Sequence, residues 1–440
     1  DDMGLGKTLQ VITFLWSEFQ ESAPGENRRA LVITPASLVF NWMNEIERFA
    51  PGLPATVVTG DVKERKALIK NAGEREVLIT SYDLLRRDLK AYQNLDFAVQ
   101  IIDEAQYIKN HGTQVAKAVK EIRSEFRLAL TGTPVENRLS ELWSIFDFLM
   151  PGFLYSYEKF RKEIELPAVQ YSNSDAMERL QKMIRPFVLR RLKRDVLKDL
   201  PDKLEKDMFS PLESEQKELY EAHTERLRLM LGMQSDAEFR TSKLQILAEI
   251  TRLRQICCYP GLVYEGYKGN SSKLEMCMEL VQNAVNGGHK ILLFSQFTTM
   301  LDVLAVRLKK AKVSFYMLTG ATSKEKRAQM VQAFNEDDTS VFCISLKAGG
   351  TGLNLTAADI VIHYDPWWNL AVQNQATDRA HRIGQQNVVS VYRLFMKDTI
   401  EERIRALQER KRELADEILS GEGIGQALIS REEVLELLGR

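Results

Sequence analysis

The alternation of short apolar runs with helix-length segments constrains this chain more than any other feature. Runs rich in Val, Ile and Leu alternate with amphipathic stretches over residues 29–130 and again from about residue 272. Such alternation is typical of parallel sheets covered by helices on both faces. We therefore expect an α/β fold with two parallel-sheet units. Strands are expected at 29–34, 55–59, 76–80, 97–102 and 126–130, and then at 290–294, 313–317, 340–345, 359–363 and 388–394.

A helical region separates the two α/β units. Helices are expected there at 138–149, 175–184, 214–232 and 239–257, and a long amphipathic helix follows residue 396. The expected domains are therefore residues 1–137, an insertion and linker at 138–270, a second unit at 271–395 and a helical brace at 396–440. The run Arg190-Arg191-Leu192-Lys193-Arg194 fits either a solvated face or a contact with nucleic acid.

Composition narrows the classes of function. The 440 residues are 44% hydrophobic and 28% charged, as in an ordinary globular protein, and the net charge is −1. A nucleic-acid binder that is basic throughout is excluded, so any such surface must be local. No run of 18 apolar residues exists, so neither a membrane span nor a membrane partner is expected. The four cysteines lack ligand-like spacing and are expected to be buried thiols.

The first ten residues, Asp-Asp-Met-Gly-Leu-Gly-Lys-Thr-Leu-Gln, are typical of a phosphate-binding loop that leads into a helix. Gly4 and Gly6 allow the backbone to approach a phosphate, and Lys7 is expected to reach the β- and γ-phosphates of ATP. Thr8 is expected to hold Mg²⁺ through its hydroxyl. Asp1 stands where the general motif has its first glycine.

The chain begins inside this motif, without the strand that usually leads into it. We therefore expect the sequence to be a piece of a longer protein. Without a central strand, backbone groups on two neighbouring strands would lose their partners, at a cost of about 1–3 kcal/mol each. We expect this 440-residue chain to fold poorly and to hydrolyse little ATP, and the intact protein to be active.

Polar residues follow the apolar runs of the first unit, at the sheet edge where α/β proteins bind ligands. Asp103 and Glu104 end the run at 97–102, so Asp103 is expected to hold Mg²⁺ and Glu104 to activate the attacking water. A surface turn with two acids is the competing interpretation. The other polar residues at these ends are Thr34, Pro35, Thr80, Ser81, Gln106, Thr131, Gly132 and Thr133.

The second unit carries the stretch Gln375–Gln385. Arg379 and Arg382 are spaced i, i+3, so we expect them on one face of a helix at 369–380 and its continuation, as arginine fingers for the γ-phosphate. A salt-bridged surface helix is the alternative. A glycine-rich loop before it is expected to hold nucleic-acid phosphate or ribose, with Trp368 packed at the cleft. The residues of this group are Lys347, Gly350, Thr351, Gly352, Asn354 and Trp368.

Together these residues resemble the Snf2 family of DNA-dependent ATPases, within helicase superfamily 2. Leu-Thr-Gly-Thr-Pro at 130–134 and Asp-Arg-Ala-His-Arg-Ile-Gly-Gln at 378–385 are the most specific parts. The other matching stretches are Asp1–Gln10, Leu31–Trp42, Ile79–Asp83, Asp103–Gln106, Pro186–Leu200, Leu292–Gln296 and Ile344–Asn369. Asp1 is the family's usual form of the loop, whereas Gln106 stands where many members have His.

The resemblance implies two RecA-like lobes of the P-loop NTPase type that close on ATP and Mg²⁺ and step along double-stranded DNA. It places nucleotide contacts at Lys7, Thr8 and Gln375, and coupling to DNA at Gln106 and Thr131–Thr133. An RNA-directed helicase of the same superfamily and a scaffold that binds nucleotide without turnover remain the alternatives.

The resemblance also implies partners without choosing among them. The DNA-bound protein that is moved, whether a nucleosome, a polymerase or another protein, stays open, as does action as a monomer or within a larger complex. The absence of appended reader domains favours a bacterial or archaeal protein, hence cytoplasmic and associated with the nucleoid; a eukaryotic protein would be nuclear.

Overall fold

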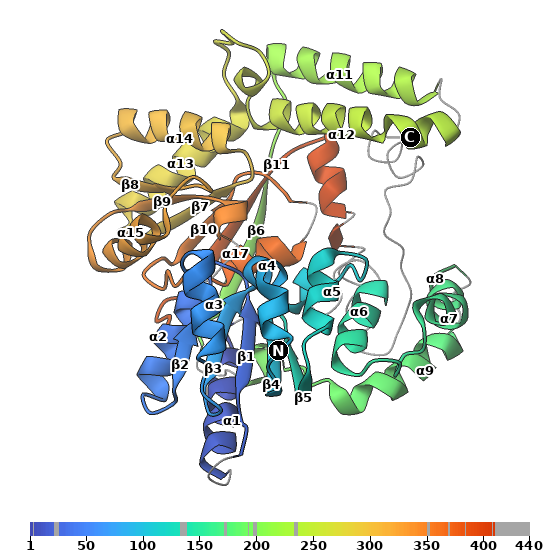
Figure 1. Ribbon diagram of the computed structural model, residues 1–440. Helices are drawn as coiled ribbons and strands as arrows, with labels where there is room; N and C mark the ends of the chain where they lie inside the picture. The colour runs from blue at the N-terminus through green and yellow to red at the C-terminus, as the bar shows by residue number, and fades with distance from the viewer. Residues whose placement is uncertain are drawn as a thin grey trace. The chain divides into compact units, whose positions relative to one another are not determined.

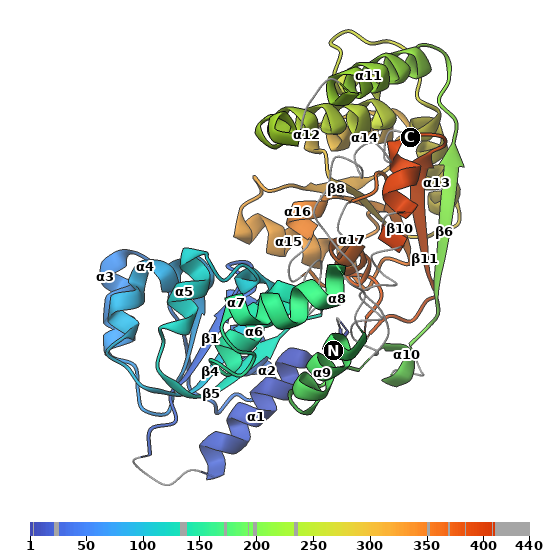
Figure 2. The same ribbon diagram turned by 90° about the vertical axis from the view of Figure 1, so that its right-hand side faces the viewer.

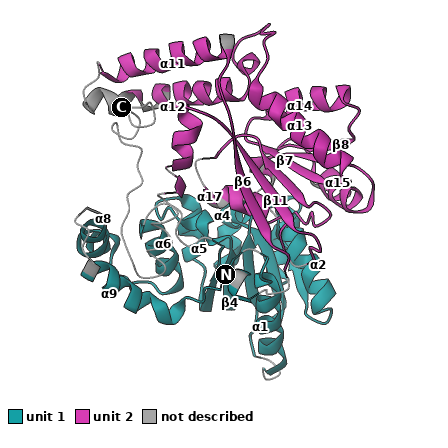
Figure 3. Cartoon of the chain, turned by 180° about the vertical axis from the view of Figure 1, so that it is seen from behind, with its two compact units in different colours: residues 1–198, 413–427 teal, residues 199–412, 428–440 magenta. Residues whose placement is uncertain are grey.

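The computed structural model describes residues 1–2, 4–21, 26–132, 139–170, 174–191, 193–196, 200–232, 236–349, 353–367, 370–382, 384–406 and 408–409. The chain divides into two compact units, residues 1–198 with 413–427 and residues 199–412 with 428–440 (Figure 3). The predicted insertion at 138–270 is thus shared between the units. The four domain boundaries that we expected stay predictions.

Unit 1 contains a five-stranded parallel sheet with the order β2-β3-β1-β4-β5 (Figure 1). Its strands are β1 (Ala30–Thr34), β2 (Ala55–Val57), β3 (Val77–Ser81), β4 (Phe97–Asp103) and β5 (Ser124–Leu130). Helices α1 (Lys7–Glu21) and α2 (Val39–Phe49) pack on one face. Helices α3 (Val62–Lys70), α4 (Tyr82–Tyr92) and α5 (Gln114–Lys120) pack on the other. The predicted parallel α/β arrangement is confirmed.

The edge of this sheet differs from our expectation. We expected two neighbouring strands to lack partners, but the described strands form one continuous sheet, with β2 and β5 as its edges. Every residue of β4 is buried, whereas Phe126 in β5 is 49% exposed. The idea of a gap in the middle of the sheet is therefore wrong for the described strands. The expected effect on folding and on ATP hydrolysis stays a prediction.

Unit 2 contains a six-stranded parallel sheet with the order β6-β11-β10-β7-β9-β8 (Figure 1). Its edge strand β6 lies beside β11 (Figure 2). Five of its strands were expected: β7 (Ile291–Ser295), β8 (Phe315–Leu318), β9 (Val341–Ser345), β10 (Ile360–His363) and β11 (Val389–Met396). Helices α13 (Ser272–Asn286) and α14 (Thr298–Lys310) cover one face. Helices α15 (Lys324–Glu336), α16 (Leu346–Gly349) and α17 (Leu370–Thr377) cover the other.

Strand β6 (Lys203–Ser210) was not expected, because its region was predicted to be helical. It pairs in parallel with β11 over eight residues, with Asp207 opposite Arg393. The Arg393 Nε lies 2.6 Å from the Asp207 carboxylate, and Arg405 contacts the same carboxylate. The charged side chains of this edge strand find partners among other charged groups and give little apolar signal in the sequence.

Two groups of helices pack outside the sheets. In unit 1 they are α6 (Leu139–Leu149), α7 (Tyr157–Phe160), a π-helical turn (Arg161–Glu165), α8 (Leu166–Gln170) and α9 (Ser174–Ile184), followed by α10 (Lys193–Val196). In unit 2 they are α11 (Ser214–Gly232) and α12 (Asp236–Cys258), which bury Ile400 and Ile404 of the helical residues 400–406. Of the predicted brace, residue 407 and residues 410–440 lie outside the described residues.

The cysteines are all buried, as expected. Burial raises the pKa of the Cys277 thiol to about 12, so it is protonated at neutral pH. Among the helices that the structure describes, none combines the length and apolar character needed to cross a bilayer.

Candidate active site

The loop before α1 has the backbone of a phosphate-binding loop. Gly4 and Gly6 have φ values of 80° and 70°, a region that side chains disfavour, and α1 begins at Lys7. The Lys7 Nζ donates to the carbonyl oxygens of Asp1 at 2.9 Å and Asp2 at 3.0 Å. The lysine ammonium is thus held inside the loop, beside the N-terminus of a 15-residue helix.

Asp103 ends β4 with its carboxylate buried. Its Oδ2 accepts from the Trp42 indole at 2.9 Å and from the Thr34 hydroxyl at 3.4 Å, and its Oδ1 accepts from the Glu104 N–H at 2.9 Å. Burial raises the pKa of this carboxyl, while the donors and the charge of Lys7 oppose the rise. A cation beside Asp103 would therefore favour its charged form.

A chain of side chains leads away from Glu104. The Thr131 hydroxyl donates to the Gln106 side-chain oxygen at 3.0 Å, and the Gln106 amide nitrogen donates to the Glu104 carboxylate at 2.8 Å. Glu104 itself has φ 52°, a left-handed conformation that costs on the order of 1–3 kcal/mol in a side-chain-bearing residue. Strain of this kind clusters at functional sites.

The other described strand-end residues of unit 1 are buried or half-buried, and one of them caps a helix. Thr34 and Thr80 are fully buried, and Pro35 is also buried. Ser81 is the N-cap of α4, where its hydroxyl accepts from the Leu84 N–H at 3.3 Å. Gly132 is half-buried after β5, and Thr133 lies outside the described residues. Their predicted contacts with DNA stay predictions.

Two side chains that the sequence analysis did not assign to this site contact its residues. Trp42 reaches Asp103 from α2, and Arg191 pairs with Asp1 of the loop at 2.5 Å. The signal for Trp42 was limited to its place in a family-like stretch. Arg191 was noted only as part of the basic run, because its contact spans 190 positions in the chain.

In unit 2, Gln375 lies in α17 and is 9% exposed. The prediction that Arg379 and Arg382 share one helical face is wrong, because α17 ends at Thr377. Arg379 follows in a turn and is buried, and its carbonyl accepts from the Leu355 N–H at 3.1 Å. Arg382 donates to the Leu353 carbonyl at 3.5 Å.

Gln385 binds backbone groups beyond the end of α17. Its amide nitrogen donates to the carbonyl oxygens of Ala358 at 2.8 Å and Ala380 at 3.1 Å, and its oxygen accepts from two following N–H groups. Gly384 precedes it with φ 102°, a value that favours glycine. The buried amide thus supplies partners to backbone groups outside the helix.

The remaining predicted residues of unit 2 are only partly described. Asn354 is exposed, and its carbonyl accepts from the Asn335 amide at 2.8 Å. Lys347 lies in α16. Gly350, Thr351, Gly352 and Trp368 lie outside the described residues. His381, which we did not expect to be catalytic, contacts the Pro201 carbonyl at 2.9 Å.

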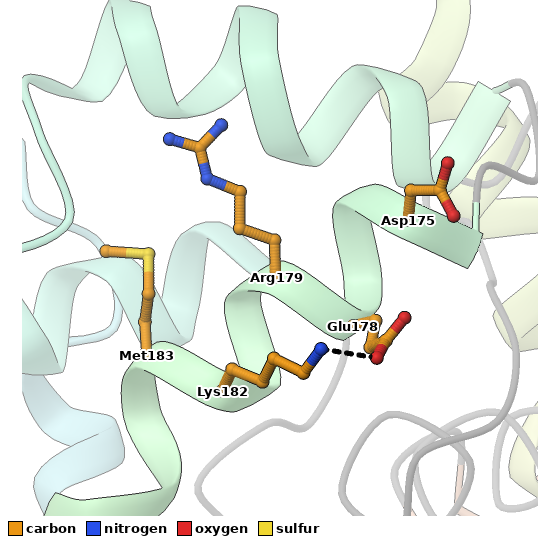
Figure 4. A pocket seen from close by; sticks show the side chains of 5 residues that line it. All are labelled: Asp175, Glu178, Arg179, Lys182 and Met183. Atoms are coloured by element: carbon orange, nitrogen blue, oxygen red, sulfur yellow. Dashed lines mark ion pairs between the residues drawn. The ribbon is translucent and has the colours of Figure 1, made fainter.

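A shallow hollow over α9 contains none of the predicted site residues (Figure 4). It is lined by Asp175, Glu178, Arg179, Lys182 and Met183. Lys182 pairs with Glu178 at 2.6 Å one helical turn away, and this contact lowers the pKa of the exposed Glu178 carboxyl. The polar groups of the hollow thus belong to a solvated helix face.

Comparison with known families identifies two domains in this chain. The model of the SNF2-related domain matches residues 1–262, and that of the Helicase conserved C-terminal domain matches residues 272–384. The first match covers more than half of the 440 residues.

Among curated proteins, the chain is similar to an uncharacterized ATP-dependent helicase of Mycoplasma pneumoniae, with 40% identity over 99% of this chain and 41% of the relative. It is also similar to the putative ATP-dependent helicase/translocase YwqA of Bacillus subtilis, with 40% identity over 96% of this chain and 46% of the relative. The chain therefore spans less than half of these relatives.

Among solved structures, the chain is similar to the Sulfolobus solfataricus SWI2/SNF2 ATPase core in complex with dsDNA. The identity is 38%, the match covers 96% of this chain and 88% of that one, and the TM-score is 0.45.

Proposed function

Because this chain belongs to the SNF2-related family, we propose that it is the motor region of an ATP-driven translocase acting on double-stranded DNA. In this proposal it hydrolyses ATP to ADP and phosphate when bound to duplex DNA and uses the energy to move along it. Relatives named as ATP-dependent helicases, one of them as a translocase, support a motor that consumes ATP.

One observation carries the proposal most directly. The charge of the Lys7 ammonium, at the start of α1, opposes the rise in the pKa of the Asp103 carboxyl, at the end of β4. A lysine at a helix N-terminus binds the β- and γ-phosphates, and a carboxylate at a buried strand end holds the metal ion that bridges them. A lysine and a carboxylate at these two positions favour a nucleoside triphosphate over a substrate without phosphates.

The residues present fit Mg²⁺. This ion binds through one or two protein oxygens and keeps several water molecules, so one carboxylate and one hydroxyl suffice. Asp103 supplies a buried carboxylate whose raised pKa a cation would oppose, and Thr8 supplies a hydroxyl in the first turn of α1. When bound, Mg²⁺ neutralises charge that develops on the transferred phosphoryl group.

Glu104 is the proposed general base. It would accept a proton from the attacking water, and Gln106 and Thr131 hold its carboxylate in place. In unit 2, Arg379 and Arg382 are the proposed fingers, since guanidiniums match the equatorial oxygens of a γ-phosphate. Gln375 is proposed to contact the nucleotide, and the loop at 350–352 is proposed to hold the DNA backbone.

Removal of the Glu104 carboxylate tests the proposal. Duplex DNA should stimulate ATP hydrolysis, and Glu104→Gln should abolish turnover while sparing ATP binding, because the amide cannot accept the proton. Glu125→Gln, which changes an exposed acid of the same unit, is the control. An unchanged rate in Glu104→Gln would favour the scaffold that binds nucleotide without turnover.

The choice of nucleic acid is tested in the same assay. Stimulation by duplex DNA that exceeds stimulation by RNA supports the proposal, and the reverse order supports an RNA-directed helicase. The moved partner is proposed to be a DNA-bound protein. With bacterial relatives at 40% identity, we propose a location with the bacterial or archaeal nucleoid.

A further inference from the structure

The segment around Arg191 is hydrogen-bonded to the start of the phosphate loop through its backbone. The Asp2 N–H donates to the Arg191 carbonyl at 3.0 Å, and the Arg191 N–H donates to the Asp1 carboxylate at 3.0 Å. The Lys193 N–H donates to the Asp2 carboxylate at 3.0 Å. We call this contact of residues 1–2 with residues 191 and 193 the clasp.

Side chains strengthen the clasp. The Arg191 guanidinium contacts both oxygens of Asp1, Nε to Oδ1 at 3.3 Å and Nη2 to Oδ2 at 2.5 Å. The same Nη2 donates to the Gln10 side-chain oxygen at 2.6 Å, one turn into α1. The Asp1 side chain is 6% exposed and the Arg191 side chain is 37% exposed. The carboxylate therefore has less access to water and depends more on this contact for hydrogen bonds than the guanidinium does. A forked contact of this kind fixes orientation as well as distance.

The clasp acts on the residues that hold the catalytic lysine. Lys7 donates to the backbone carbonyls of Asp1 and Asp2, the two residues that Arg191 and Lys193 hold. Arg191 therefore fixes the loop on both sides of the ammonium, at Asp1 before it and at Gln10 after it. A pre-arranged loop binds phosphate without a further loss of conformational entropy.

We propose that Arg191 is a positioning residue of the phosphate loop, which sets nucleotide affinity by holding Asp1 and α1 in the orientation that aims Lys7. The inference rests on the proposed nucleotide site. It assigns a role in the ATP site to one member of the basic run, in place of a contact with nucleic acid.

Affinity for Mg–ATP and steady-state hydrolysis measured on the full chain test this role. Arg191→Ala should weaken Mg–ATP affinity and raise KM roughly 10- to 100-fold, as expected for loss of hydrogen bonds to a charged group. The kcat at saturating ATP should stay within about two-fold, because bound nucleotide restores the loop. Arg191→Lys, which keeps the charge without the fork, should fall between wild type and Arg191→Ala.

Asp1→Asn completes a double-mutant cycle. If both residues act through the clasp, Asp1→Asn combined with Arg191→Ala should weaken affinity no more than the stronger single change. Arg185→Ala, which changes an exposed arginine of the same segment, is the control and should bind Mg–ATP as wild type does. If Arg191→Ala does not fold, Arg191→Lys and Asp1→Asn carry the same comparison.

Three outcomes overturn the inference: wild-type affinity in a folded Arg191→Ala, additive effects in the cycle, or a loss confined to DNA affinity. Failure of the proposed function looks different. A wild-type chain that binds Mg–ATP but hydrolyses none would refute the proposed motor, and the affinity cycle would still decide the role of Arg191.

Discussion

The Trp42 indole donates a 2.9 Å hydrogen bond to the buried carboxylate of Asp103, 61 positions later in the chain. This contact ties α2 to the end of β4, where the proposed metal ligand lies. Burial raises the pKa of this carboxyl, and the indole hydrogen bond opposes the rise by favouring the charged form.

Trp42→Phe should therefore destabilise the protein in a manner that depends on pH. The pKa of Asp103 is raised in the folded protein, so its protonated carboxyl adds to the free energy of unfolding at low pH. This contribution is lost as the pH rises from 3.8, the ordinary carboxyl pKa, through the pKa in the folded protein. Loss of the indole donor raises the folded pKa further, so the contribution is lost over a wider range of pH. Denaturant unfolding should show a larger loss for Trp42→Phe at neutral pH than near pH 3.8, with Trp16→Phe as control. An equal loss at both pH values would contradict this role.

Gln106→Ala should lower kcat about ten-fold or more with a smaller effect on KM, because it removes the donor that orients Glu104. Gln106→His should retain most of the activity, since an imidazole also donates a hydrogen bond. The ATPase rate with and without duplex DNA measures both variants. Equal rates for Gln106→Ala and wild type would show that the link from Thr131 to Glu104 is dispensable.

Arg379→Ala should lower kcat by about 10³-fold, within the range known for arginine fingers, and spare ATP binding. Arg379 lies in a turn and does not share a helical face with Arg382, so changing it alone tests one proposed finger at a time. Arg307→Ala removes an arginine with a 3.0 Å surface ion pair to Glu275 and serves as the matched control. Full activity in Arg379→Ala would remove this residue from the mechanism.

The pair Lys273–Glu401 is fully buried, with a contact of 2.6 Å, and it joins α13 to the helical residues 400–406. Lys273→Met should destabilise unit 2 by about 3–5 kcal/mol, because it leaves a buried carboxylate without its cation. Adding Glu401→Gln should recover most of the loss, since the amide oxygen still accepts from the Met396 N–H. Urea unfolding of both variants checks this, and a double variant as unstable as Lys273→Met alone would contradict it.

Much of the fold follows from local patterns. The apolar runs before Thr34, Ser81 and Asp103 are buried in full, so hydrophobicity alone located these strands and the polar residues at their ends. Strand β6 was missed because its charged residues pair with other charged groups and show no apolar pattern; they are Lys203, Glu205 and Asp207. Its stability comes from pairing with β11, which is remote in sequence.

The contacts within the site could not be predicted from such local patterns. Recognisable motifs contain Lys7, Asp103 and Glu104. The side chains that orient these residues, however, come from distant parts of the sequence. Nothing near Trp42 marks it as a donor to Asp103, and the position of Arg191 in a basic run suggested a surface role. The end of α17 was misjudged because the residues after Thr377 form a turn whose backbone groups bind partners remote in the chain, such as Leu355 at the Arg379 carbonyl.

The clasp also joins two parts of unit 1 that lie far apart in the sequence. Asp1 and Asp2 contact Arg191 and Lys193, 190 and 191 positions later. Closing a loop of that length costs conformational entropy, which contacts near the N-terminus alone do not repay. The first residues of the chain therefore gain their final arrangement late in folding, and a fragment that ends before residue 191 would keep the glycine-rich sequence without the contacts that order it.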